Sequence, residues 1–84
     1  MIEPQHTMGQ RKDGSPWRIS TDFGSGVTVE QDGHVVLQGD QIAARGRRVT
    51  FKSASSAAEI GAALIAAAEF AGSLTAEDLR GYDD

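Results

Sequence analysis

The segment "SSAAEIGAALIAAAEFAG", residues 55–72, constrains the fold of this chain most, because it is rich in alanine, the best helix former, and almost lacks charge. A surface helix usually carries one apolar stripe and a charged opposite face. Here Glu59 and Glu69 are the only charged residues. A sheet can cover one side of such a helix, so the apolar character of the other side needs a separate explanation.

At about 100° per residue, one broad stripe is predicted to cover the sheet: Ala57, Ile60, Gly61, Leu64, Ala67, Ala68 and Ala71. Two further stripes are left over, one with Glu59, Ala63, Ala66 and Phe70 and one with Ala58, Ala62, Ile65 and Glu69. Alanine could fill exposed positions only because it favours helices. Alternatively, small side chains let two helices approach to the short end of the usual spacing of about 8–10 Å.

We favour the second explanation, because Ile65 and Phe70 are large and are predicted to point away from the sheet on opposite sides. The sequence therefore predicts a homo-oligomer formed through helix 56–71. The candidate self-association residues are Ala63, Ala66, Phe70 and Ile65.

Short alternating runs separated by glycine signals follow one another from Trp17 to Lys52, as in an antiparallel meander. Strands are predicted near residues 17–22, 26–30, 34–38, 41–45 and 47–52. A three-residue loop, Gln31 to Gly33, would place Val29 opposite Val35 and Val27 opposite Leu37. Two-residue turns at Gly39-Asp40 and Arg45-Gly46 would then add Ile42, Ala44, Val49 and Phe51 to the same apolar face.

Helix signals complete the predicted domain. Ser56 and Glu59 match a capping box, Gly72 is a stop, and "TAED" opens a short helix through Leu79 and Arg80. Residues 1–16 show no periodicity, so we expect a flexible N-terminal arm followed by one domain over 17–84. The predicted fold class is α+β: an antiparallel meander of four to five strands packed on one Ala-rich helix, plus a short C-terminal helix.

Composition limits the cellular compartments and the kinds of binding site that we expect for this chain. The 84 residues include no cysteine and carry a net charge of -4, which disfavours disulfides, zinc-thiolate sites and a protein that mainly coats nucleic acid. The apolar run "IGAALIAAA" is much shorter than the roughly 20 residues of a membrane span, and the N-terminus lacks an apolar signal core. We expect a cytoplasmic protein without membrane insertion.

The segment "RGRRVTFK" holds four of the eight basic residues and is the candidate site for phosphate or another ligand: Arg45, Arg47, Arg48 and Lys52. No aromatic residues interleave with these on the strand face, as single-strand binders require, so we favour a solvated edge strand guarded by charge. "FGSG" leads into a strand, so it is read as a hairpin loop and not as a phosphate cradle.

No catalytic or metal site is expected. The two histidines, His6 and His34, lack the spacing of metal ligands, and Asp32 beside Gly33 is first a turn residue. Trp17 is expected to serve the core and not an exposed recognition site. No cofactor is predicted, and an enzyme is the least favoured class.

The polar start, the glycine-turn strands "EQDGHVVLQGD" and "RGRRVTF" and the Ala-rich "SAAEIGAALIAAAEF" resemble the small orphan proteins of actinobacteriophages. The resemblance covers residues 17–72 and concerns composition. Several proteins of that group are toxic to the host and bind a host protein, so the resemblance implies a non-enzymatic, cytotoxic modulator in the host cytoplasm. The alternative, from the residues themselves, is a nucleic-acid or nucleotide binder that uses strand 45–52.

Overall fold

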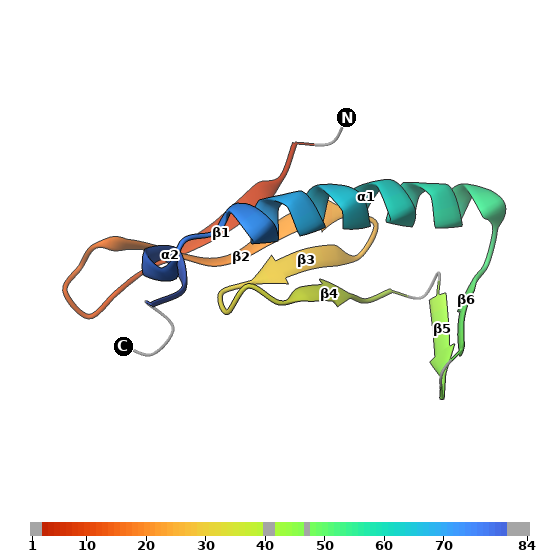
Figure 1. Ribbon diagram of the computed structural model, residues 1–84, viewed down its shortest axis with the longest axis horizontal. Helices are drawn as coiled ribbons and strands as arrows, with labels where there is room; N and C mark the ends of the chain where they lie inside the picture. The colour runs from red at the N-terminus through yellow and green to blue at the C-terminus, as the bar shows by residue number, and fades with distance from the viewer. Residues whose placement is uncertain (1–2, 40–41, 47, 81–84) are drawn as a thin grey trace.

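The computed structural model describes residues 3–39, 42–46 and 48–80. Its main sheet is antiparallel, in the order β1-β2-β3-β4, with β1 (Gln5–Gln10), β2 (Pro16–Gly24), β3 (Val27–Glu30) and β4 (Val35–Leu37). A separate hairpin joins β5 (Ile42–Arg45) and β6 (Arg48–Phe51). The long helix α1 (Ala54–Ser73) lies along one face of the sheet, and the short helix α2 (Ala76–Arg80) follows it (Figure 1). The predicted α+β class is confirmed.

Strand β1 corrects the predicted N-terminal arm. Residues 5–10 pair with β2, so the boundary at residue 16 is wrong for this segment. The turn between the two strands is hydrogen-bonded, with Gly14 N–H donating to the Arg11 carbonyl at 2.9 Å and Arg11 N–H to the Ser15 carbonyl at 3.0 Å. Gly14 takes the left-handed conformation that this turn requires, with φ 87°.

The ladder between β1 and β2 contains a bulge. Thr7 pairs with Ser20 and Met8 pairs with Arg18, so Ile19 has no partner residue on β1. The Ile19 side chain is 39% exposed and lies against Gly9, where an added Cβ would be 2.8 Å from Ile19 Cδ1. The bulge therefore leaves Ile19 partly exposed and keeps Arg18 paired with Met8.

The hairpin of β3 and β4 has the predicted register. Val29 pairs with Val35 and Val27 pairs with Leu37. Gly33 has φ 87°, as expected for the left-handed position of a three-residue loop. An alanine Cβ at Gly33 would lie 3.2 Å from Leu79 Cδ2, so this turn is also packed against α2.

The hairpin of β5 and β6 corrects the predicted single meander, because it does not pair with the main sheet. Gln38 N–H donates to the Gly26 carbonyl at 2.8 Å and extends the contact of β4 with β3, after which Gly39 redirects the chain with φ 149°. The predicted turn at Gly39-Asp40 lies partly outside the described residues. Arg45 pairs with Arg48 and is therefore a strand residue, and the predicted turn at Arg45-Gly46 is wrong.

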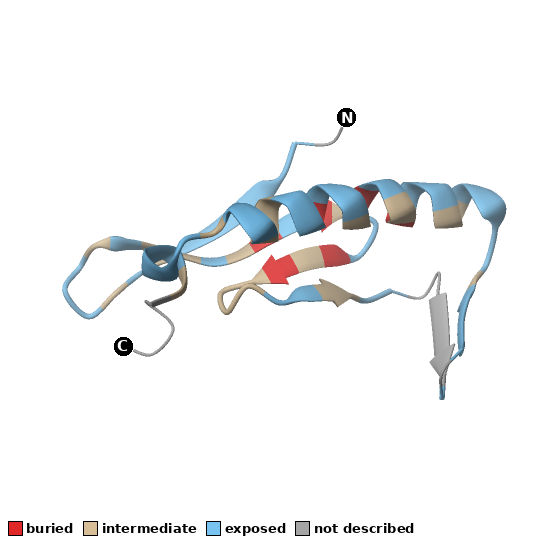
Figure 2. Ribbon diagram, in the orientation of Figure 1, coloured by how far each residue is buried: buried red, intermediate tan, exposed pale blue. Residues whose placement is uncertain are grey.

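The core lies between β2, β3 and one side of α1 (Figure 2). Its buried apolar side chains are Phe23, Val27, Val29, Ile60, Ala63 and Ala67. The small Ala63 and Ala67 allow the helix to lie close to the strands. The side of α1 that faces the sheet is thus centred on Ile60, Ala63 and Ala67, whereas Ala68, which we predicted to face the sheet, is exposed.

The helix ends differ slightly from the sequence signals. Ser53, and not Ser56, caps α1, because its side chain accepts a hydrogen bond from Ser56 N–H at 3.1 Å. The helix passes the predicted stop at Gly72 and ends at Ser73. For α2 the predicted cap is observed: Asp78 N–H donates to Thr75 Oγ1 at 3.2 Å, and Thr75 N–H donates to Asp78 Oδ2 at 2.8 Å.

Candidate binding surfaces and cleft

The side of α1 opposite the sheet is an exposed and mostly apolar surface, which we call the outer stripe: Ala58, Ala62, Ile65 and Glu69. Its members are spaced by four, three and four residues, the spacing that places side chains in one line along a helix. Ile65 is 65% exposed, the largest fraction among the exposed large hydrophobic side chains of the described chain. Glu69 is the only charged member.

The predicted self-association residues are divided between the two sides of the helix. Ile65 lies on the outer stripe, and Ala66 beside it is also exposed. Ala63 is only 6% exposed and belongs to the core, and Phe70 is half-buried against it. The predicted outward orientation of Ala63 and Phe70 is therefore wrong, because the helix is rotated about its axis relative to the face that its alanine pattern indicated.

Phe70 is instead the centre of an aromatic and cationic cluster near the C-terminal end of α1. Its ring lies 5.6 Å from the Phe23 ring and 5.8 Å from the His6 ring, measured between centroids. The Arg18 guanidinium lies over the Phe70 ring at 5.3 Å. Phe70 thus joins the helix to β1 and β2, with a cation–π contact on one side.

Helix α1 is also the one helix among the described residues that is long and apolar enough to cross a bilayer, with a mean hydropathy of 1.3. The run "IGAALIAAA" is too short to span a membrane, but the whole 20-residue helix is long enough. Ile60, Ala63 and Ala67 are the buried residues of this helix, and most of its apolar window is exposed, unlike that of a core helix.

The predicted basic site is only partly described. Arg48 and Lys52 are exposed, Arg45 is paired opposite Arg48 across the hairpin, and Arg47 lies outside the described residues. The described side chains of this segment therefore contribute two exposed positive charges, Arg48 and Lys52.

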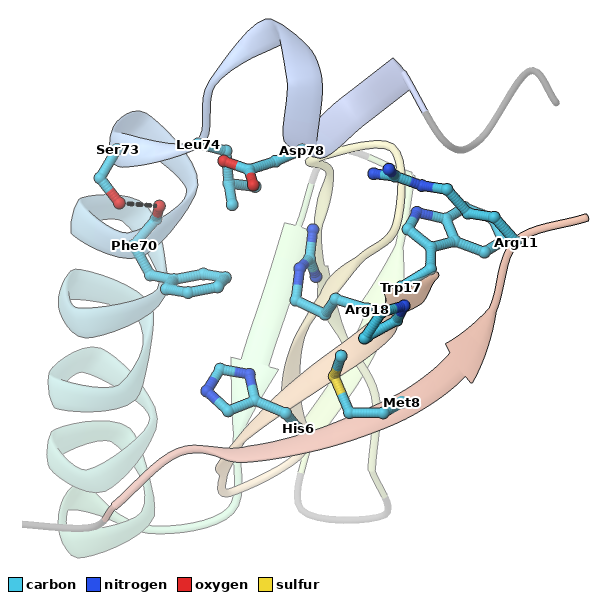
Figure 3. A pocket seen from close by; sticks show the side chains of 10 residues that line it. His6, Met8, Arg11, Trp17, Arg18, Phe70, Ser73, Leu74 and Asp78 are labelled. Carbon is cyan, nitrogen blue, oxygen red and sulfur yellow. Dashed lines mark hydrogen bonds between the residues drawn. The ribbon is translucent and has the colours of Figure 1, made fainter. Parts of the chain in front are cut away.

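A cleft of about 440 Å³ lies where β1, β2, α2 and the C-terminal end of α1 meet (Figure 3). Phe70 and Ser73 line one side and Arg11 and Trp17 the other, with Arg18 between them. The complete lining is His6, Met8, Arg11, Pro16, Trp17, Arg18, Phe70, Ser73, Leu74 and Asp78. Trp17 is half-buried in this lining, so the expectation that it serves the core describes it only in part.

Two polar side chains of this region are fixed by the fold. Arg18 Nη1 donates to the Val29 carbonyl at 3.0 Å, and Arg18 Nη2 donates to the Glu30 carbonyl at 3.2 Å. His6 Nδ1 and Thr21 Oγ1 share a hydrogen bond of 2.8 Å, which provides a partner for the fully buried hydroxyl of Thr21. His6 therefore has a structural role under the helix end.

Asp78 places a negative charge at the rim of the cleft. Its carboxylate accepts hydrogen bonds from the Thr75 backbone N–H and from Thr75 Oγ1, at 2.8 and 2.9 Å. These bonds, first from the backbone and then from the side chain, lower the pKa of Asp78, and the positive charges of Arg18 and Arg11 act in the same direction. Asp78 is therefore ionised at neutral pH.

Two hydrogen-bond donors at the cleft are buried without a partner among the described residues: Arg11 Nε and Trp17 Nε1. Arg11 also donates through Nη2 to the Glu77 carbonyl at 3.3 Å, so its side chain is held against α2. Buried polar atoms are normally hydrogen-bonded, and an unpaired donor marks a place where an acceptor would be favourable. Within the described residues, no three His, Cys, Asp or Glu side chains gather as metal ligands would.

The cleft could not be predicted from the sequence because three of its residues, His6, Met8 and Arg11, lie in the segment predicted to be an arm. A signal for this hairpin was present. Asp13-Gly14 is a turn dipeptide of the same kind as Asp32-Gly33, and it precedes the strand that begins at Pro16.

The chain matches no protein-family model, no curated protein and no solved structure.

Proposed function

We propose that the protein is a small non-enzymatic binding protein that self-associates through the outer stripe of α1. The observation that carries this proposal is the exposure of Ile65, 65% of whose surface is open in the middle of a helix face with one charge. Covering an aliphatic side chain of this size stabilises a contact by about 1.5–3 kcal/mol. A second copy of the chain supplies the same apolar stripe by symmetry.

The charges near the two ends of α1 favour an antiparallel pair. With Ala62 at the crossing point, Glu69 lies level with the partner's Ser55, in the first helical turn. That turn contains no acidic residue, and the helix N-terminus attracts negative charge. Lys52, exposed just before the helix, adds a positive charge near the same position. Each Glu69 thus meets a favourable environment on the other copy.

Sedimentation velocity of purified full-length protein tests this arrangement. We expect Ile65→Lys to raise the dissociation constant of the oligomer at least about tenfold, because the substitution places a charge in the contact. Val49→Lys is the matched control, since Val49 is 51% exposed on the hairpin, and it should leave the oligomer intact. A wild-type protein that sediments only as a monomer, or equal effects of the two variants, would refute the proposal.

Charge exchange tests the antiparallel geometry separately. Lys52→Glu should weaken self-association because it places a negative charge near the partner's Glu69. Adding Glu69→Lys should restore part of the loss if the two side chains lie close together across the pair. A double variant that is weaker than both single variants would contradict the antiparallel arrangement.

The resemblance to actinobacteriophage proteins extends the proposal to a phage-encoded, cytotoxic modulator that binds a host protein in the host cytoplasm. Its support is compositional, together with the apolar outer stripe. Tagged protein should retain one host protein from actinobacterial lysate in a fixed ratio, and the retention should survive nuclease treatment. Retention of no host protein would refute this extension without affecting self-association.

A second candidate function is binding of nucleic acid or nucleotides by the hairpin. The exposed Arg48 and Lys52 favour it, because basic side chains of this kind contact phosphates. Such binding must weaken steeply with salt and be lost in Arg48→Glu. A salt-insensitive interaction, or material retained equally by Arg48→Glu, would exclude phosphate contacts as its basis.

A further inference from the structure

We propose that the cleft between the β1–β2 hairpin and the C-terminal end of α1 binds a small monocarboxylate with an aromatic or other apolar body. This site is separate from the outer stripe, which lies on the opposite side of α1. Its volume of about 440 Å³ falls within the usual range of small-molecule sites, about 300–1,000 Å³.

Two unpaired donors belong to residues that line the cleft, so a group that pairs with them must be an acceptor. Arg11 Nε and Trp17 Nε1 are both N–H donors, and neither has an acceptor among the described residues. A buried donor without a partner carries a desolvation cost that a ligand oxygen would remove. A carboxylate has two acceptor oxygens and suits a guanidinium particularly well.

The charges of the lining select a single negative charge. Arg11 and Arg18 bring two guanidinium groups to the cleft, whereas Asp78 brings one carboxylate. The sum is one positive charge, which a monoanion neutralises, whereas a phosphate dianion would leave a net negative charge beside Asp78. Asp78 is held by Thr75 and remains at the rim as the α2 cap, and Arg18 is held by the Val29 and Glu30 carbonyls, so the donor left for the ligand on the guanidinium groups is Arg11 Nε.

The remaining lining indicates an apolar body for the ligand. Met8, Pro16, Trp17, Phe70 and Leu74 form its apolar walls, and two of these residues are aromatic. The faces of aromatic rings attract other rings in offset or edge-to-face arrangements. A ligand with a ring or short apolar chain attached to a carboxylate would satisfy both parts of the lining.

Tryptophan fluorescence of the full-length protein provides a direct test, because the single tryptophan, Trp17, lines the cleft. Phenylacetate is the probe, phenylacetamide its neutral counterpart, and inorganic phosphate the compact anion. We expect a saturable change with phenylacetate at a dissociation constant of about 1 mM or below, as ligand efficiency allows for ten heavy atoms. Phenylacetamide should bind at least about tenfold more weakly, because it lacks the charge.

Variants locate the binding. Arg11→Gln should weaken phenylacetate at least about tenfold, whereas Lys12→Gln, which removes the adjacent exposed cation outside the cleft, should not. Arg11→Lys keeps the charge but removes Nε, and it should also weaken binding, which separates the hydrogen bond from general attraction. Circular dichroism checks that each variant is folded.

Three results would overturn the proposal. These are no saturable change with phenylacetate up to about ten times the expected constant, equal affinity for the acid and its amide, and tighter binding of phosphate than of phenylacetate. Equal losses in Arg11→Gln and Lys12→Gln would also overturn it, because they would place the effect in the total charge of the chain and not in the cleft. Ile65→Lys should bind phenylacetate normally whatever its oligomeric state.

Discussion

The β3–β4 and β5–β6 hairpins are both antiparallel pairs closed by a left-handed glycine, yet only the first is part of the sheet that α1 covers. Gly33 in the first turn is packed against Leu79 of α2, whereas an added Cβ at Gly46 in the second would meet nothing within 4 Å. Val29 in the first hairpin is fully buried, and Val49 in the second is 51% exposed. The second hairpin reaches the core only through Phe51, which is partly buried against it, so strand pairing and full burial are separate properties of these two hairpins.

A valine-to-alanine substitution in each hairpin is expected to show the largest difference in the free energy of unfolding. We expect Val29→Ala to lower the free energy of unfolding by about 2–3 kcal/mol, from lost burial and the cavity that remains. Val49→Ala should change it by less than about 0.5 kcal/mol, because that side chain is half open. Urea unfolding followed by circular dichroism gives both values. Similar losses would mean that Val49 is buried to the same extent as Val29, which would contradict the difference between the two hairpins.

Strand β1 extends the comparison to a third antiparallel pair, the one whose core contact is polar. His6→Ala should lower the free energy of unfolding by about 1–3 kcal/mol, because it leaves the buried Thr21 hydroxyl without its partner. Gln5→Ala, at an exposed position of the same strand, is the control and should lie within about 0.5 kcal/mol of wild type. If both variants equalled wild type, residues 5–10 would behave as the arm that the sequence predicted.

The smallest expected effect on stability comes from removing the Asp78 carboxylate, which caps α2 and so holds Leu79 beside the β3–β4 turn. The pKa of Asp78 is lowered in the folded chain, chiefly by the hydrogen bonds from Thr75, so the folded state favours the ionised form. Its contribution is complete above the unfolded value of 3.8 and is lost as pH falls through the lower folded pKa. Asp78→Asn should therefore be slightly less stable than wild type at pH 7, with the difference vanishing in strong acid. A difference that persists or grows below the folded pKa would assign the effect to packing.

The register of β3 and β4 could be predicted from the sequence, because three valines and a leucine alternate around one turn. A single loop length puts all four side chains on one side of the sheet. The face of α1 that packs on the sheet could not be predicted, because alanine occurs on every side of the helix and its faces differ little in hydrophobicity. The buried Ala63 and the exposed Ala68 differ only in their neighbours, which no local pattern contains.

The candidate cleft could not be derived for a related reason. Its parts come from β1, β2, α1 and α2, and β1 offers no apolar alternation, because its inward position at His6 is polar and matched to Thr21. His6 is itself exposed, so β1 resembles a solvated segment in the sequence although the His6 imidazole is the partner of the buried Thr21 hydroxyl. The exposed position of Ile65 was predicted correctly, whereas the same argument placed Phe70 outside although its ring packs beside Phe23.

The bulge in β2 has a consequence for chain length. The ladder passes from Ser20 to Arg18 without using Ile19, so β2 contains one residue more than its pairing with β1 requires. Loss of Ile19 would straighten the strand and leave His6 opposite Thr21 and Met8 opposite Arg18. Deletion of residue 19 should therefore shorten β2 by one residue while the same side chains continue to face α1.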